Sequence, residues 1–272
     1  MAAESGGSAR TAESDKLWNE TNVDPVELHL GKDSGYTLRA YRMSDTLPRE
    51  DVVVEPTKSK DDVEDGPDVG DNPEDEDENE VPDEIDFLDE LDAAPEEVPV
   101  FLTRKGKLLV FRDPESLAEY VAESDDNDLA VIEEYGELQK RITAEAIVCD
   151  EADTYEMDLV VANLRGGHDA WEPELLIKAA EVGRDLGFAL RNQSIVEALT
   201  SGSPLDDIDE SLRLIVDGGF RGAFARRRLR KTGSEQAAIA WRAVIAKINR
   251  SVEWRGTARA ESTEETSGDS AE

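Results

Sequence analysis

Hydrophobic and polar residues alternate with a period of two in two short stretches near the N-terminus. The apolar positions are Val26, Leu28 and Leu30 in the first stretch, and Tyr36, Leu38 and Ala40 in the second. The five residues between them, 31–35, start and end with glycine, which is typical of a turn. The pattern predicts a β-hairpin within residues 17–42 with a five-residue loop. Because two isolated strands are marginal in water, we expect them to pair with other strands.

A second hairpin is predicted after residue 97, where VPVFL and LLVFR flank TRKGK and Gly106 supplies the turn. Asp113 followed by Pro114 predicts the start of a helix over 113–124. Short apolar runs predict three more strands, at 129–132, 146–149 and 157–162.

The period changes to that of helices after Gly166, Gly167 and His168. Helices are expected over 172–190, 194–199, 206–216, 220–231 and 234–252. The fold class is therefore α+β, a small β-rich domain with hairpins plus a helical C-terminal region.

Composition adds a long disordered acidic linker to this picture. Hydrophobic residues make up 38% of the 272 residues and charged residues 35%, with a net charge of −35. Twenty of the acids lie in residues 61–97, which hold no Lys or Arg. Such a segment has too little apolar surface to offset the entropy of ordering it. The expected organisation is a disordered tail (1–16), a hairpin (17–43), the linker (44–97), the rest of the α+β domain (98–165), the helical region (166–256) and a second tail (257–272).

Three interpretations of the acidic run stay open. It is a solubilising spacer, a mimic of nucleic acid that occupies a basic groove, or a calcium site. The run from Asp71 to Asp77 lacks the glycine and terminal glutamate spacing of an EF-hand loop, which disfavours calcium.

An apolar island lies inside the acidic run, in VPDEIDFLDELDAAP. Acids mixed with Phe and Leu are typical of a docking peptide whose apolar anchors fill a groove on a partner protein. The predicted anchors are Ile85, Phe87, Leu88 and Leu91. The alternative is that the island lies on the protein's own folded domain.

The opposite charge gathers near the C-terminus, where residues 221–259 hold eleven basic residues and two acidic ones. The segment FRGAFARRRLRK is the candidate for contact with nucleic acid, because phosphates bind clustered cations. Its predicted contact residues are Arg221, Arg226, Arg227, Arg228, Arg230 and Lys231. The alternative is that this helix pairs with the protein's own acids, such as Asp206, Asp207, Asp209 and Glu210.

Catalytic motifs do not guide the interpretation. The chain has two histidines, His29 and His168, and one cysteine, Cys149, so neither an internal disulfide nor a cysteine-based zinc site is expected. No nucleophile elbow, phosphate-binding loop or zinc-protease motif occurs. We assign no catalytic residue, no cofactor and no metal. The N-terminus lacks the apolar segment of a signal peptide and no long apolar run occurs, so a cytoplasmic protein without a membrane partner is expected.

Two segments flank the acidic insertion: LWNETNVDPVELHLGKDSGYTLRAYR and VPVFLTRKGKLLVFRDPESLAEYV. Together with the insertion they resemble an uncharacterised family of acidic actinobacterial proteins that often carry the label "primosomal protein". The resemblance covers mainly residues 17–42 and 98–124. It implies a cytoplasmic bacterial protein with a link to DNA replication.

The sequence thus favours a non-catalytic interaction protein that works near nucleic-acid machinery, with an acidic docking segment for a basic or apolar groove of a partner protein and a basic C-terminal helix. One alternative is a direct DNA- or RNA-binding protein that its own acidic linker inhibits. The other is an enzyme with a carboxylate- or lysine-based mechanism, which a pocket lined by acids of raised pKa would support.

Overall fold

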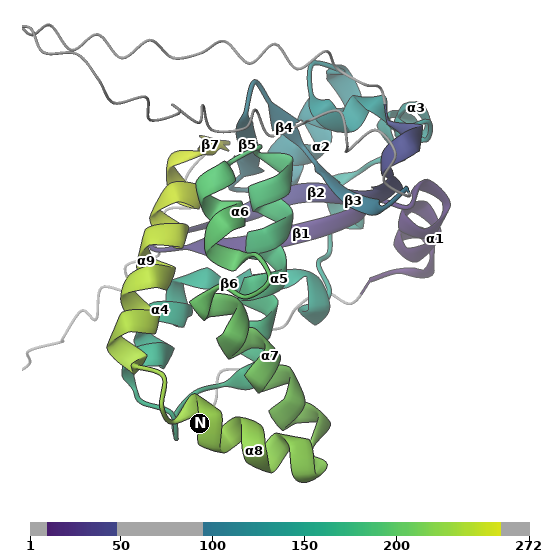
Figure 1. Cartoon of the computed structure of the whole chain (residues 1–272). Coiled ribbons are helices and arrows are strands. Elements are labelled where there is room, and N and C mark those ends of the chain that lie inside the picture. Colours follow the sequence, from purple (N-terminus) through teal and green to yellow (C-terminus); the bar gives the residue numbers. More distant parts are fainter. Residues whose placement is uncertain (1–9, 48–94, 257–272) are drawn as a thin grey trace, which may run out of the picture.

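A mixed sheet of seven strands with helices on both faces forms the body of the protein (Figure 1). The computed structural model describes residues 10–47 and 95–256. The predicted α+β fold class is confirmed. No helix in these two ranges is long and apolar enough to cross a membrane.

The first predicted hairpin is confirmed, with β1 (Asp24–Leu30) antiparallel to β2 (Asp33–Met43). Its loop is shorter than expected, because Leu30 already pairs with Asp33 and leaves only two residues in the turn. Gly31 takes a φ of 74° there, in the left-handed region that favours glycine. Gly35 continues β2, and a Cβ on it would lie 2.5 Å from the carbonyl oxygen of Phe111. Only glycine lets the two backbones approach so closely at this position.

The second predicted hairpin is confirmed around its turn, where β4 (Thr103–Arg104) is antiparallel to β5 (Lys107–Phe111) and Gly106 has a φ of 71°. The preceding strand β3 (Glu97–Phe101), which was expected to pair with β5, pairs with β2 instead. The order of the sheet is β4-β5-β2-β1-β6, and β3 also pairs with β2. Two short strands add parallel pairs: β6 (Thr154–Glu156) lies beside β1, and β7 (Val252–Arg255) beside β5.

Three helices pack on one face of the sheet: α1 (Ala12–Thr21), α2 (Pro114–Glu123) and α3 (Tyr135–Arg141). Asp113 caps α2 as predicted, with its Oδ1 accepting a hydrogen bond of 2.7 Å from the backbone N–H of Ser116. Leu109 and Phe111 of β5 point to this face. Because their neighbours Leu108 and Val110 point to the other face, β5 is apolar on both faces from Leu108 onward.

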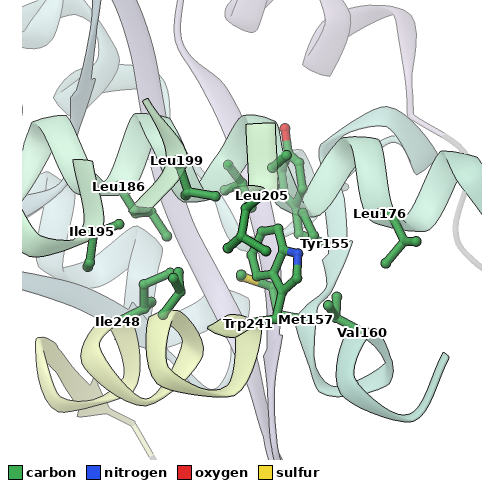
Figure 2. Close-up of a cluster of buried hydrophobic side chains, with 14 of the residues drawn as sticks. Tyr155, Met157, Val160, Leu176, Leu186, Ile195, Leu199, Leu205, Trp241 and Ile248 are labelled. Atoms are coloured by element: carbon green, nitrogen blue, oxygen red, sulfur yellow. The ribbon is translucent and has the colours of Figure 1, made fainter. Parts of the chain in front are cut away.

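Six helices cover or extend from the other face (Figure 1). They are α4 (Met157–Arg165), α5 (Pro173–Ala189), α6 (Gln193–Leu199), α7 (Pro204–Asp217), α8 (Gly219–Leu229) and α9 (Ser234–Arg250). The last five confirm the helices predicted from residue 172 onward. Figure 2 shows Trp241 of α9 among side chains of α4, α5, α6 and α7. The same cluster includes Val26 and Leu108 of the sheet, so the β-rich part and the helical part share one core.

The three shorter strand predictions were wrong. Residues 129–132 lie mostly in a 3-10 helix, η3 (Asp128–Val131), and 146–149 follow another one, η4 (Ala144–Ala146). Residues 157–162 belong to α4, where Met157, Val160 and Leu164 turn one face to the core. Apolar runs of four to six residues carry too little periodicity to separate a strand from a turn of helix.

The boundaries of the outer segments also differ from expectation. The first helix begins at Ala12, inside the tail expected over 1–16, and Thr11 caps it through a hydrogen bond to the N–H of Ser14. The linker begins after a further 3-10 turn, η1 (Ser44–Thr46). The last helix ends at Arg250, and the strand β7 that follows was not predicted.

We expect Trp241→Ala to lower the free energy of unfolding by about 4 kcal/mol, because it leaves a large cavity in the shared core. The matched control is Ile239→Ala on the same helix, where the side chain is 58% exposed, against 2% for Trp241. Urea denaturation should show a change within about 0.5 kcal/mol for this control. Equal losses in the two variants would contradict the packing described here.

Candidate functional site

The α7–α8 helical hairpin extends away from the sheet at one end of the molecule (Figure 1). The second helix packs chiefly against α7, through its buried Gly222, Ala225 and Leu229. A Cβ on Gly222 would lie 2.8 Å from the carbonyl oxygen of Leu214, so glycine permits the close contact of the two helices. Gly218, at a φ of 77°, ends α7 and turns the chain into α8.

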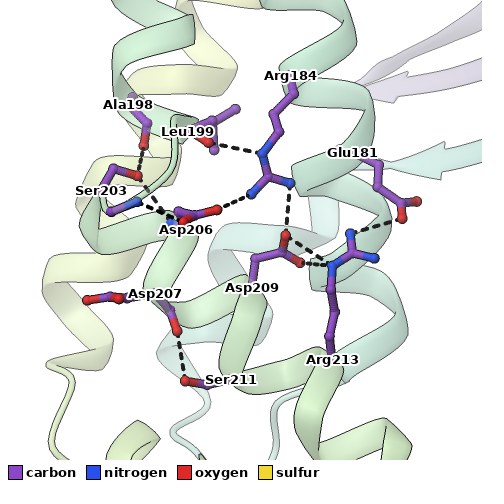
Figure 3. A network of polar contacts seen from close by, with 11 residues as sticks. Glu181, Arg184, Ala198, Leu199, Ser203, Asp206, Asp207, Asp209, Ser211 and Arg213 are labelled. Atoms are coloured by element: carbon purple, nitrogen blue, oxygen red, sulfur yellow. Dashed lines mark hydrogen bonds and ion pairs between the residues drawn. The ribbon is translucent and has the colours of Figure 1, made fainter. Parts of the chain in front are cut away.

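An arginine on α5 holds α7 in place (Figure 3). Arg184 donates to Asp206 and to Asp209, with 2.8 Å in each contact, and to the carbonyl oxygen of Leu199 at 3.0 Å. Both aspartates are buried residues of α7. Their burial is tolerated because each carboxylate has a charged partner.

Arg213 of α7 extends this network toward solvent (Figure 3). Its Nε donates to Asp209 at 3.1 Å, and its Nη2 donates to Glu181 of α5 at 2.9 Å. Burial acts to lower the pKa of Arg213, but the contacts with Glu181 and Asp209 outweigh it and raise that pKa. The guanidinium therefore stays charged and joins α7 to α5 a second time.

The predicted nucleic-acid contact residues lie together on the outer helix of the hairpin. All six are exposed: Arg221, Arg226, Arg227 and Arg228 lie on α8, and Arg230 and Lys231 follow directly after it. Arg228 is 2.5 Å from Asp207, and Arg230 is 3.7 Å from the fully exposed Asp169. In the part of the chain that the structure describes, the other four have no ion-pair partner.

Two of the four acids that were the alternative partners of this helix are engaged elsewhere, and the exposed Glu210 has no ion pair among the described residues. Asp206 and Asp209 bind Arg184, and only Asp207 reaches an arginine of α8. The internal network therefore leaves most of the cations of α8 accessible.

Two adjacent hollows lie beside α8, and together they are called the α8 groove. The larger, about 590 Å³, is lined by small residues of α8 and by arginines: Ile215, Gly218, Gly219, Gly222, Ala223, Arg226, Arg227 and Arg230. The smaller, about 260 Å³, extends from Arg226 and Arg230 to His168 and Trp171. Ile215, Arg226 and Arg230 line both hollows and so join them.

Two aromatic side chains of this surface were not among the predicted contact residues. Phe220 is 90% exposed and Phe224 is 74% exposed. They are four residues apart on α8 and face away from its buried stripe. The spacing was visible in the sequence, but which side of the helix is covered depends on α7.

The predicted docking anchors Ile85, Phe87, Leu88 and Leu91 lie outside the described residues. Cys149 is partly buried, and burial raises the pKa of its thiol far above the ordinary value. His29 hydrogen-bonds Glu27, which raises the pKa of the imidazole. Within residues 10–47 and 95–256, no group of three or more His, Cys, Asp and Glu side chains is arranged to hold a metal ion.

A second cluster of charged groups surrounds Arg39 of β2, which is buried. Its Nη1 donates to the hydroxyl of Tyr155 and its Nη2 to Asp153, both at 2.8 Å, and Asp185 of α5 lies 3.6 Å away. Asp185 in turn accepts a hydrogen bond of 2.6 Å from Tyr41. These side chains line a hollow of about 470 Å³.

Burial shifts the acids of this second cluster. Burial raises the pKa of Asp153, although Arg39 opposes the shift, and it also raises the pKa of Asp185 against the hydrogen bond from Tyr41. Burial raises the pKa of Tyr155 and of Tyr41 as well. The cluster thus holds carboxyl groups whose protonation lies closer to neutral pH than usual.

Comparisons with known proteins identify one family. The family model of the SatS C-terminal domain matches residues 91–249. A solved structure described as the crystal structure of SatS C-terminal domain in complex with bromine is similar in fold, with a TM-score of 0.57 and 18% identity. The similarity covers 90% of this chain and all of that one. No curated protein matches this chain.

Replacing Arg184 with methionine should lower the free energy of unfolding by about 3 kcal/mol, because Asp206 and Asp209 would stay buried without their main cation. As a control, Arg165→Met removes an exposed pair with Glu235 (3.0 Å). That change should cost less than about 1 kcal/mol. Chemical denaturation of both variants measures the difference, and an equal effect would remove the structural role assigned to Arg184.

Proposed function

Because the chain belongs to the SatS C-terminal domain family, whose model matches more than half of its length, we propose a function from its surface chemistry. The protein is a non-catalytic interaction protein that works beside nucleic-acid machinery in the cytoplasm, and the surface of α8 contacts a polyanionic partner. The connection with DNA replication, implied by the resemblance to proteins labelled primosomal, stays a prediction.

A single observation supports this proposal most: the cations of α8 are exposed while the nearest buried acids bind Arg184 instead. Four cations lack an ion-pair partner among the described residues: Arg221, Arg226, Arg227 and Lys231. Unpaired clustered cations bind phosphates with release of counterions. They lie on α8 or directly after it, and α8 lies away from the strands of the sheet (Figure 1).

The proposal predicts how affinity depends on salt. In the full-length protein, Arg226→Ala with Arg227→Ala should weaken binding of a labelled DNA strand about tenfold at low salt. The slope of log affinity against log salt should fall by about 1.5, since each phosphate contact contributes roughly 0.7 to 0.9. Fluorescence anisotropy measures both quantities.

The control removes the same charge from another surface. Arg242→Ala with Arg250→Ala changes two exposed arginines of α9. This variant should keep the wild-type affinity and slope. Equal weakening by both pairs would mean that net charge, not the α8 surface, governs binding, and no binding by the wild type at low salt would reject the proposal.

A second candidate function is an enzyme with a carboxylate mechanism, favoured by the hollow around Arg39. It is lined by Asp153 and Asp185, whose raised pKa values suit groups that exchange protons near neutral pH. The opposing consideration is that both carboxylates contact Arg39, an arrangement that also occurs in purely structural ion-pair networks.

The raised pKa of Asp185 has a consequence for stability. The Asp185 carboxyl group binds its proton more tightly in the folded protein than in the unfolded chain. Ionisation of Asp185 therefore costs stability as the pH rises from the ordinary carboxyl pKa, near 3.8, through the raised value. Asp185→Asn removes this loss while it keeps an oxygen that accepts from Tyr41. Urea denaturation from about pH 4 to about pH 7 covers the titration of a carboxyl group with a raised pKa. Over this range the variant should lose less stability than the wild type. Identical pH profiles would contradict the shift and, with it, the second candidate.

A further inference from the structure

The solvent-facing stripe of α8 combines aromatic rings with cations. Phe220, Phe224 and Arg227 follow one another at spacings of four and three residues, which places them on one side of the helix, and Lys231 lies in the turn that follows. The buried residues Gly222, Ala225 and Leu229 lie on the other side, against α7. Core packing therefore does not explain the two phenylalanines.

The groove beside this stripe has a wall without long side chains. Gly218, Gly219 and Gly222 line it at one end, and Gly218 and Gly219 both have φ values in the left-handed region. Arg226 and Arg230 lie where the two hollows meet. A chain-like anion thus finds an open path along the helix with guanidinium groups beside it.

The far end of the groove is polar and aromatic. His168 packs its ring on Trp171, with centroids 4.5 Å apart, and its Nε2 lies 2.9 Å from the carbonyl oxygen of Thr232. This contact positions the imidazole at the wall of the smaller hollow. The groove therefore runs from the glycine turn before α8 to the loop that precedes α5.

We infer that α8 and its groove form a binding site for single-stranded nucleic acid. Phosphates would lie against Arg226, Arg227 and Arg230, while unpaired bases stack on Phe220 and Phe224. Exposed aromatic rings beside clustered cations suit single strands, since every unpaired base offers a face for stacking, whereas a duplex keeps its bases stacked inside. The inference rests on the proposed function and specifies the partner of the same surface.

The test compares four labelled probes with the full-length protein: a DNA strand, an RNA strand of the same sequence, the corresponding DNA duplex and a polyglutamate of similar charge. Anisotropy titrations at one low salt concentration give the affinities. At least one of the two strands should bind at least about tenfold more tightly than the duplex and the polyglutamate, because only a strand can stack on the rings. The DNA and RNA arms identify which nucleic acid the site prefers.

Phe220→Ala with Phe224→Ala isolates the stacking contribution. This pair should weaken strand binding at least about tenfold while leaving the salt slope unchanged, because no phosphate contact is lost. Ile239→Ala with Leu159→Ala is the matched control, since both side chains are exposed on other helices. This control should bind as the wild type does. Because all four side chains are exposed, the variants should fold, and circular dichroism verifies this.

The outcomes separate the two proposals. Equal affinity for strand and duplex, with no effect of the phenylalanine pair, overturns the single-strand inference but leaves the polyanion surface in place. Polyglutamate that binds as tightly as a strand, with the same loss in the phenylalanine variant, assigns the surface to an acidic protein and also overturns the inference. If none of the probes binds, both proposals fail.

Discussion

The exposed surface of α8 depends on the contact of Arg184 with Asp206 and Asp209. This contact joins α7 to α5, and α8 has its main packing partner in α7. It also engages the two buried acids of α7, the helix on which α8 packs. Arg184, placed between two buried carboxylates, thus fixes the hairpin and leaves neighbouring cations accessible. One interaction accounts for both the position and the charge of the candidate site.

The strongly acidic composition acts against contact with a polyanion unless charges are separated in space. Nineteen of the twenty acids of residues 61–97 precede β3 in the sequence, and β3 lies in the sheet, away from α8 (Figure 1).

Local patterns predicted the two hairpin turns, the capped helix α2 and the five C-terminal helices. Alternation, helix caps and helical periodicity each depend on residues that are only a few positions apart. The strand prediction at 157–162 failed because the spacing of Met157, Val160 and Leu164 also fits a helix. The cations of α8 were predicted from their clustering. The exposure of Phe220 was not predictable because it depends on which side of α8 packs on α7, and the partner of Asp206 was not predictable because it depends on which side of α7 faces α5. Arg184 lies 22 residues from Asp206 on a different helix, and no local pattern links them.

Hydrogen–deuterium exchange of the full-length protein, with and without a short single strand, tests most directly whether α8 is the binding surface. Bound nucleic acid should slow exchange of the backbone amides of α8 and of the 168–171 loop, and leave the helices on the opposite face of the sheet unchanged. Protection confined to another face, or unaltered exchange throughout α8 at a saturating strand concentration, would contradict the account.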